Sequence, residues 1–414
     1  MASPSETSKL FWSHRTDFPS LKRTYNGYHL SFLDGPAGTQ VPQQVVDAVS
    51  RYYANSNANT HGQFVTTTET GQLLEHTREV MAAFLGAAGG GTISFGANMT
   101  TLNFFLSRAI ARSLQPGDEI LITQLDHEAN RGPWLTLQEH GIVVREIGVK
   151  GDASLDYDDF RSKVNERTRL VAMGWASNAF GTVNDIAIAR KLTHKAGAWL
   201  LVDAVHYAPH FPIDVQAMDM DFLLCSAYKF YGPHVGILYA RPGLLDRLRT
   251  DRLSTQDTRA PFRIETGTLN HAAIAGVKAA VEYIAALGSG PDLRSKIVSA
   301  MSLLAKYEHG LASTLFDGLS AIKGVTVRGQ SFASRERAPT IAFTLEGKRP
   351  EEVCARLAQK GICCWDGHFY AIRPMEVLGL LDQGGVTRVG FSLYNTEDEI
   401  SRLLDEVRVI ADLR

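Results

Sequence analysis

An aspartate and a lysine stand at the ends of two consecutive apolar runs near the middle of the sequence. Asp203 ends the run in AWLLVDAVH, and Lys229 follows the next run, in DFLLCSAYKFYGPHVG. A desolvated lysine has a lowered pKa and can form a Schiff base with a carbonyl, while a carboxylate can keep a pyridine nitrogen protonated. An aspartate alone at such a position is commonly a turn cap, and a lysine alone commonly extends its ammonium to solvent. The pair, on successive strands, favours pyridoxal phosphate chemistry.

A phosphate site is predicted at SFGANMTT, where Gly96 and small polar residues precede a helical segment. Free amides at a helix N-terminus bind anions, although such a segment more often marks only a helix cap. Ser226 and Tyr228 stand just before the lysine in sequence, and their hydroxyls are expected to add to this site. The backbone N–H groups expected to meet the phosphate are those of Ala97, Asn98, Met99 and Thr100.

Three other polar residues follow runs that read as strands of the same sheet. His127 comes after EILIT, where an imidazole can stack on a cofactor ring or move protons, and where an ordinary loop histidine fits equally well. Asn178 follows RLVAMGW, and His206 lies just past Asp203, within reach of the same ring.

Apolar runs alternate with amphipathic segments from about residue 92 to residue 241. Strands that alternate with helices predict right-handed crossovers and a mostly parallel sheet. In an open sheet of this kind, ligands bind outside the carboxyl ends of the strands. The candidate residues are therefore expected to meet at one edge of the sheet.

The pattern changes after Ile264, where GTLNHAAIAGVKAAVEYIAAL predicts a long helix and ALGSGPDL a break. The remaining sequence predicts a small α+β domain. We expect an N-terminal segment over 1–30, a large cofactor-binding domain over 31–288 and a small C-terminal domain over 289–414. A helix over 41–53 is expected to pack with the small domain.

The composition of the 414-residue chain excludes several classes of partner. Lys plus Arg (42) nearly balances Asp plus Glu (44) without a block of like charge, so no nucleic acid or acidic membrane surface is expected. No apolar run reaches the ~18 residues of a membrane span, and the first residues lack the pattern of a signal peptide. Four cysteines without a CxxC pair favour a cytoplasmic protein with no metal site. A small molecule and another subunit are the expected partners.

Seven stretches resemble, in order, the class V aminotransferase-fold enzymes, and among these the cysteine desulfurase-like branch. They lie between about Leu33 and Leu404. The resemblance implies the α/β architecture of fold type I pyridoxal-phosphate transferases. This fold has a large domain, with a mostly parallel mixed sheet flanked by helices, and a small C-terminal α+β domain. The stretches are SFGANMTT, GDEILITQLDHEANRGPW, ASNAFGTVNDI, VDAVHYAPHFPIDVQAMDMDF, CSAYKFYGPHVGILYAR, ETGTLNHAAIAG and VTRVGFSLYNTEDEI.

The resemblance also implies a role for each candidate residue. Lys229 forms the Schiff base with pyridoxal 5'-phosphate, Asp203 pairs with the pyridinium nitrogen and His127 stacks on the ring. Asn178 lies near the ring oxygen and the substrate carboxylate, and Arg388 binds the substrate α-carboxylate, a bidentate task suited to guanidinium.

Three further positions follow from the same resemblance. Ser226 and Tyr228 match the phosphate site, with Tyr228 where desulfurases usually have His. Thr268 is contributed by a neighbouring subunit, which implies a homodimer with shared active sites. His206 stands where desulfurases usually carry Gln, although some relatives have His.

One segment departs from the desulfurase pattern Arg-x-Gly-His-His-Cys-Ala. Residues 365–371 read WDGHFYA, so Tyr370 occupies the position of the sulfur-accepting Cys, and a phenol cannot carry persulfide sulfur. Cys363 and Cys364, in ICCW, are expected to pack on opposite faces of a strand rather than to react.

The implied reaction begins with an external aldimine between an L-amino acid and the cofactor, from which Lys229 removes the Cα proton. We expect a desulfurase-like or C–S/β-eliminating lyase that works without a persulfide Cys. Tyr370 or His368 protonates the leaving group, or the two residues only pack at the entrance and orient the loop. The alternatives are a class V aminotransferase, an epimerase or a β-decarboxylating enzyme that forms carbon–carbon bonds. A relative without turnover is disfavoured because the chain keeps Lys229, Asp203, His127 and Arg388.

Overall fold

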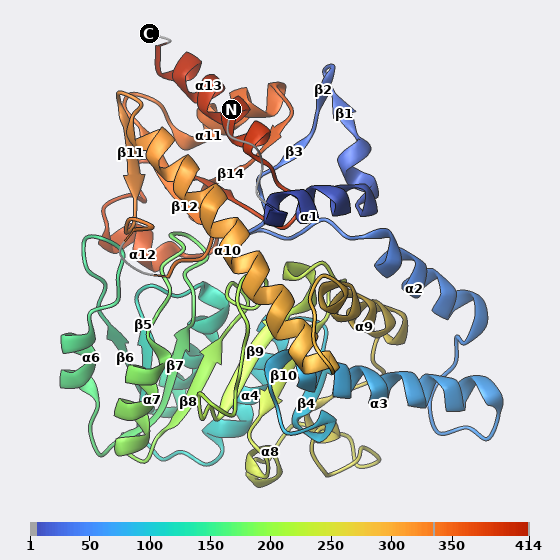
Figure 1. The fold of residues 1–414 in the computed structure, drawn as a ribbon. Coiled ribbons are helices and arrows are strands. Elements are labelled where there is room, and N and C mark those ends of the chain that lie inside the picture. The colour runs from blue at the N-terminus through green and yellow to red at the C-terminus, as the bar shows by residue number, and fades with distance from the viewer. Residues whose placement is uncertain (1–5, 334–335, 413–414) are drawn as a thin grey trace.

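The computed structural model describes residues 6–333 and 336–412 of the chain. A large domain holds a seven-stranded sheet, and a smaller group of strands and helices lies above it in Figure 1. The long helix α10 (Leu293–Ser320) runs diagonally from the large domain to the small one. α13 (Glu397–Asp412) lies at the upper end of the molecule in Figure 1, and α1 (Glu6–His14) lies below it, in the upper half.

The large sheet is mostly parallel, as the alternation of strands and helices predicts. Four of its neighbouring pairs are parallel, and only β10 runs antiparallel to both of its neighbours. The strands in spatial order are β4 (Ile93–Gly96), β10 (Gly236–Ala240), β9 (Phe222–Ser226), β8 (Trp199–Asp203), β7 (Thr168–Gly174), β5 (Glu119–Thr123) and β6 (Val143–Ile147).

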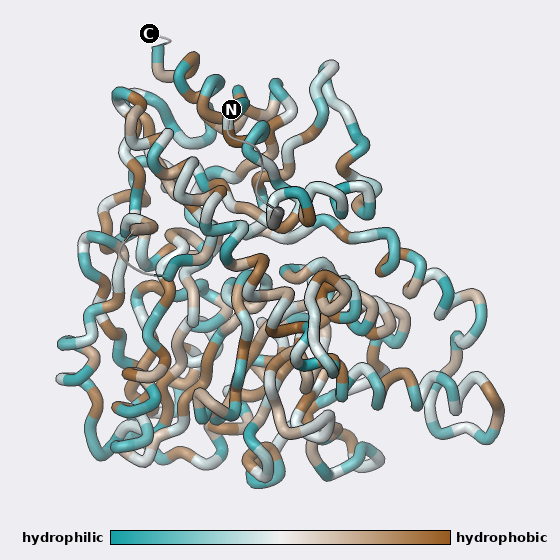
Figure 2. Tube along the Cα trace, in the orientation of Figure 1, coloured by the Kyte–Doolittle hydropathy of each residue, from teal (hydrophilic) through white to brown (hydrophobic). Residues whose placement is uncertain are grey.

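Both faces of this sheet are buried, which explains why its strands read as continuous apolar runs. In β8, Leu200 and Val202 join one core and Leu201 joins the other, because successive side chains point to opposite faces. Figure 2 shows the resulting brown strands inside the large domain. The helices around the sheet are α3 (Val65–Leu85), α4 (Met99–Ala111), α5 (Gly132–Leu135), α6 (Tyr157–Lys163), α7 (Ile186–Lys195), α8 (Leu244–Arg247) and α9 (His271–Ala286).

The small domain is built on an antiparallel sheet in the order β11, β12, β15, β14. An early strand joins this region, because β3 (Ser31–Phe32) pairs with β13 (Ile362–Cys363). β1 (Thr24–Tyr25) and β2 (Tyr28–His29) form a separate two-stranded sheet. The other elements are β11 (Val325–Arg328), β12 (Thr340–Leu345), α11 (Pro350–Gln359), β14 (Trp365–Gly367), α12 (Ile372–Val377) and β15 (Val386–Gly390).

The helix expected over 41–53 is α2 (Gln43–Asn55), and its packing differs from the expectation. It lies along α9, which belongs to the large domain, instead of against the small domain. Val45 and Tyr52 form its buried stripe, and Tyr52 donates to or accepts from Nδ1 of His271 at 3.3 Å. The helical period identifies an apolar stripe but not the element that covers it. The break between α9 and α10 falls at 287–292, and the boundary near residue 288 stays a prediction.

A buried ion pair fixes α3 against the edge of the large sheet. Arg78 donates through Nη1 and Nη2 to both carboxylate oxygens of Glu265, at 2.6 and 2.8 Å. Nη1 also donates to the carbonyl of Ile93, and Glu265 accepts from the amide of Phe95 at 2.7 Å. The pair connects α3, β4 and the segment before α9, so each charge is satisfied although both side chains are almost fully buried.

We expect Arg78→Met to lower the free energy of unfolding by about 3–5 kcal/mol, because it leaves the Glu265 carboxylate buried without its cationic partner. Urea denaturation followed by circular dichroism measures this change. Arg408→Met is the matched control, since Arg408 forms an exposed pair with Asp405, and it should change the value by less than about 1 kcal/mol. Equal stabilities of the two variants would contradict the role of the buried pair.

Candidate active site

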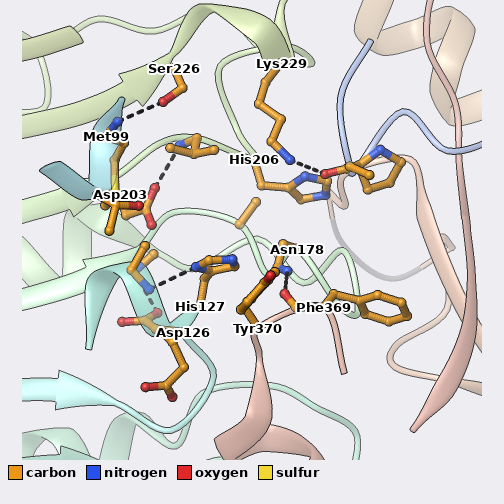
Figure 3. Close-up of a pocket in the computed structure, with 18 of the residues that line it drawn as sticks. Met99, Asp126, His127, Asn178, Asp203, His206, Ser226, Lys229, Phe369 and Tyr370 are labelled. Carbon is orange, nitrogen blue, oxygen red and sulfur yellow. Dashed lines mark hydrogen bonds between the residues drawn. The ribbon is translucent and has the colours of Figure 1, made fainter. Parts of the chain in front are cut away.

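A cavity of about 580 Å³ opens at the carboxyl ends of β5, β7, β8 and β9, between the large and small domains. Figure 3 shows side chains from both domains converging on it. Twelve of the predicted site residues line it: Asn98, Met99, Thr100, His127, Asn178, Asp203, His206, Ser226, Tyr228, Lys229, Tyr370 and Arg388.

Lys229 lies in the 3-10 turn after β9, and its side chain is buried. Its Nζ donates to the backbone carbonyl of Pro36 and lies 5.0 Å from the centre of the Tyr228 ring. Burial, followed by the cation of Arg388, lowers the pKa of Lys229 to about 7, against the attraction of Asp203 and Asp34. A substantial fraction of neutral amine is therefore present near neutral pH.

Asp203 ends β8 and accepts a hydrogen bond from the amide of Val205 at 2.9 Å. It is two residues beyond Leu201, so it lies on the same face of the sheet, which α4 covers. Burial, with a smaller contribution from the neighbouring Asp126, raises the pKa of Asp203 to about 7. A positively charged group placed against this carboxylate would relieve both effects.

His127 is held by its own turn. Its Nδ1 accepts the amide hydrogen of Ala129 at 2.9 Å, so the ring proton is on Nε2. Burial, then the cations of Lys229 and Arg388, lower the pKa of His127 to about 4. The imidazole is therefore neutral at physiological pH, and it lies 5.6 Å from the ring centre of Tyr370.

The N-terminus of α4 forms the part of the cavity that is suited to an anion. Asn98 caps the helix by accepting from the amide of Thr101 at 2.9 Å, and the amide of Met99 donates to Oγ of Ser226 at 3.1 Å. Gly236 on β10 permits this close packing, because a Cβ atom there would lie 2.3 Å from the carbonyl carbon of Asn98. The start of α4 therefore packs closely against β9 and β10 at the site.

Arg388 on β15 brings a buried guanidinium to the cavity. Its Nη1 donates to the backbone carbonyl of Asn178 at 2.8 Å, and its Cζ lies 4.0 Å from the centre of the Phe369 ring. Burial lowers the pKa of Arg388 to about 9, opposed by the carboxylate of Asp34 and the phenol of Tyr228. The remaining donors of Arg388 are suited to a carboxylate ligand.

The segment that holds Tyr370 is fixed through its backbone. Phe369 and Tyr370 have φ of 54° and 58°, the left-handed region that residues other than Gly rarely adopt. Nδ2 of Asn178 donates to the carbonyl of Phe369 at 2.9 Å, and the amide of Glu128 donates to the carbonyl of Tyr370 at 2.7 Å. These bonds compensate the backbone strain, and the Tyr370 phenol, 68% exposed, stands at the mouth of the cavity.

The cysteines lie outside the cavity lining. Cys363 pairs through its backbone with Phe32, and burial raises the pKa of its thiol to about 11. The Sγ atom of Cys364 lies 3.4 Å from that of Cys354 on α11, and this hydrogen bond, with burial, raises the pKa of the Cys364 thiol well above its ordinary value. Cys225 is buried in β9. Neither thiol of ICCW is activated in this structure.

Three predicted residues do not line the cavity: Ala97, His368 and Thr268. Ala97 is exposed ahead of α4, and His368 accepts from the amide of Tyr370 through Nδ1. Thr268 is exposed beside a different hollow, which Tyr53 and Asn59 also line.

Sequence reasoning missed two acids that act on the site. Asp126 accepts from the amide of Gly174 at 2.8 Å, and burial raises its pKa to about 6. Burial also raises the pKa of Asp34 to about 6, and one of its carboxylate oxygens is buried without a partner in the described chain. Asp126 precedes His127 at a strand end, so the rule that selected His127 would have selected it as well.

Residues 6–333 and 336–412 contain neither a candidate membrane-spanning helix nor a candidate metal-binding cluster. No helix there is long and apolar enough to cross a membrane. No group of three or more His, Cys, Asp or Glu side chains in that part is arranged to hold a metal ion.

Comparison with known proteins gives one consistent result. The family model for aminotransferase class-V matches residues 31–403. A cysteine desulfurase from Shigella flexneri is 32% identical over 406 residues, which cover 94% of this chain and 95% of that protein.

Two solved structures have the same fold. An apo cysteine desulfurase from Thermococcus onnurineus NA1 superimposes with a TM-score of 0.87 at 25% identity, covering 99% of both chains. A cysteine desulfurase from Escherichia coli gives a TM-score of 0.83 at 28% identity, covering 98% of both chains.

We expect Lys229 of the cofactor-free protein to be acetylated with a midpoint near pH 7, because its neutral amine predominates above its lowered pKa. Lysines in water react with a midpoint near about 10.4. A short pulse of acetic anhydride at each pH, followed by peptide mass spectrometry, gives the profile. Arg388→Met should move the midpoint upward because it removes a nearby cation, and a wild-type midpoint above pH 9 would contradict the assignment.

Proposed function

Because the chain belongs to the aminotransferase class-V family, whose members use pyridoxal phosphate, we propose that it is a desulfurase-like lyase. It acts on an L-amino acid and eliminates a group, such as one attached through sulfur, from Cβ without a persulfide cysteine. The observation that carries this proposal is the cavity lining, which contains Lys229, Asp203 and Arg388 but, among the described residues, no cysteine.

The cavity fits the family's cofactor. Asn178 Oδ1 and His206 Nδ1 are buried polar atoms with no partner among the described residues, as expected where a ligand completes the hydrogen bonding. Asp203 is a buried carboxylate that a pyridinium nitrogen would neutralise, and the start of α4 with Ser226 would hold the phosphate. Lys229 is the lysine that would bond covalently to the carbonyl carbon of the cofactor.

The protein side of the reaction follows from three residues. When bound, pyridoxal phosphate supplies an electron sink for the electron pair left at Cα. Lys229, whose pKa is about 7, accepts the Cα proton as a general base. Arg388 holds the substrate carboxylate, and the backbone bond to Asn178 fixes the direction of its guanidinium.

The leaving group is protonated at the mouth of the cavity. Tyr370 is an exposed phenol in the cavity lining, and His368, two residues before it, accepts from its amide, so we propose one of these two residues as the proton donor. A leaving group that departs as the protonated species needs no thiol acceptor. Transamination is the second candidate, since Lys229 is the one lysine in the cavity lining and would serve as the base that transamination also needs. Epimerisation and β-decarboxylation with carbon–carbon bond formation are further alternatives.

We expect an amino acid with a sulfur group on Cβ to give ammonia, a keto acid and the leaving group in equal amounts, without an added keto acid. A panel of amino acids with detection of sulfide, ammonia, keto acid and carbon dioxide makes the measurement. Lys229→Ala should abolish the absorbance of cofactor bound through this lysine and lower the rate by about 10³-fold, since it removes the general base.

Cysteine variants distinguish direct release of the leaving group from transfer of its sulfur to a cysteine thiol. Cys364→Ala and Cys363→Ala should keep the wild-type rate within about twofold, because neither residue lines the cavity. Sulfide release that disappears in Cys364→Ala would refute the proposal. Exchange that depends on an added keto acid would instead identify an aminotransferase.

We also infer a homodimer with shared active sites. Thr268 is exposed and absent from the cavity of its own chain, which is consistent with a role in the partner's phosphate site. Tyr53, Phe64 and Val65 are large apolar residues that are 60%, 59% and 68% exposed. They lie on α2, α3 and the loop between them, two helices at one edge of the molecule in Figure 1, and we propose that they contact a second copy of the chain.

We expect sedimentation velocity at micromolar concentration to give a mass twice that of one chain. Val65→Asp should raise the dissociation constant of the dimer at least about tenfold, because it places a charge in the apolar surface. Val409→Asp is the control, since Val409 is 55% exposed on α13, and it should leave the mass unchanged. A single-chain mass for the wild type would contradict the dimer.

A further inference from the structure

His206 is a buried imidazole with one satisfied and one unsatisfied nitrogen. Its Nε2 lies 2.9 Å from Oγ1 of Thr340, and its Nδ1 has no partner in the described part of the chain. The residue lines the cavity next to Lys229, whereas Thr340, on β12 of the small domain, does not line it. Nδ1 is thus the nitrogen whose hydrogen bonding the described residues leave incomplete.

The hydrogen bonding of the Thr340 hydroxyl indicates which ring nitrogen of His206 carries the proton. The Thr340 side chain is fully buried, and His206 Nε2 is its sole side-chain partner among the described residues. If Nε2 carried the proton, the threonine hydroxyl would accept and its own hydrogen would be buried without an acceptor, which is unfavourable. The hydroxyl therefore donates, Nε2 accepts, and the single proton of a neutral imidazole lies on Nδ1.

The imidazole is neutral and its ring is fixed. Burial, then the positive charges of His210, Lys229 and Arg388, lower the pKa of His206 well below its ordinary value. The His210 ring lies at 5.4 Å and 77° to that of His206, and Nδ1 of His210 is held 2.7 Å from Oε2 of Glu308. The packed ring of His210 and the bond to Thr340 both restrict rotation of the His206 ring.

We propose that Thr340 is a positioning residue: its hydroxyl holds His206 in the tautomer protonated on Nδ1 and so presents a hydrogen-bond donor to an oxygen atom of the bound cofactor. Thr340 pairs in the sheet with Gly390, two residues from Arg388. The small domain thus orients both the carboxylate-binding guanidinium and, through Thr340, a donor on the large domain. This inference rests on pyridoxal phosphate binding in the cavity but not on which reaction follows.

Thr340→Val tests the proposal, because it keeps the shape of the side chain and removes the hydroxyl. The first readout is the ¹⁵N spectrum of histidine-labelled, cofactor-free protein, with the His206 signals assigned from a His206→Phe variant. We expect the wild type to show a protonated Nδ1, and Thr340→Val to move the proton toward Nε2. The second readout is the dissociation constant of pyridoxal phosphate, which should rise about tenfold when the donor is lost.

Two further variants separate positioning from packing. Thr340→Ser keeps the hydroxyl and should restore the wild-type tautomer and an affinity within about twofold. Thr193→Val is the matched control, since Thr193 is also fully buried but its hydroxyl lacks a partner in the described chain and lies outside the cavity, and it should change neither readout.

The proposal is overturned if wild-type His206 is protonated on Nε2. It is also overturned if Thr340→Ser weakens cofactor binding as much as Thr340→Val, because the methyl group and not the hydroxyl would then be responsible. A wild-type protein that does not bind pyridoxal phosphate would instead refute the proposed function, while the spectrum of the cofactor-free protein would still test the role of Thr340.

Discussion

The removal of Lys229 from water is the constraint on which the site depends. A buried ammonium is unfavourable, so its neutral form is stabilised, and the nearby Arg388 adds to this effect. The same burial raises the pKa of Asp203, and Asp126 beside it adds a second carboxylate. A ligand that brings a cation to Asp203 and an anion to Arg388 would offset the cost of burying the carboxylate and the cost of burying the guanidinium. The buried charges therefore select for a ligand with this charge distribution, and they do so before any chemistry begins.

The fold supplies this arrangement by combining two different sheets. Parallel strands bring Asp203 and the turn of Lys229 to one edge, because the carboxyl ends of β8 and β9 lie side by side. The antiparallel sheet of the small domain brings Arg388, whose strand pairs with both β12 and β14. Backbone bonds at Asn178 then join the two parts, since its carbonyl accepts from Arg388 and its side chain donates to Phe369. The relative position of the two charges thus depends on the packing of one domain on the other.

The sequence predicts the parts of the site that follow from strand ends, and fails where a contact depends on packing. It predicts Lys229 and Asp203 because a polar residue that follows an apolar run in a parallel sheet lies at the carboxyl end of a buried strand. It does not predict the pairing of His206 with Thr340, since 134 residues separate them and no local pattern marks Thr340. The left-handed backbone of Phe369 and Tyr370 is missed as well, because neither residue type favours that conformation. Packing also decides the position of α2, whose apolar stripe is evident in the sequence but whose partner α9 is not.

The conformation of the segment around Tyr370 depends on its main chain more than on its side chains. The carbonyls of Phe369 and Tyr370 accept the bonds that hold the loop, while the phenol is largely exposed and contacts the rings of His127 and His368. A different side chain at this position would leave those backbone bonds in place. The residue type at position 370 can therefore change while the loop and the charges of Lys229, Asp203 and Arg388 stay the same. A thiol there could accept sulfur, whereas a phenol can only donate or accept a proton.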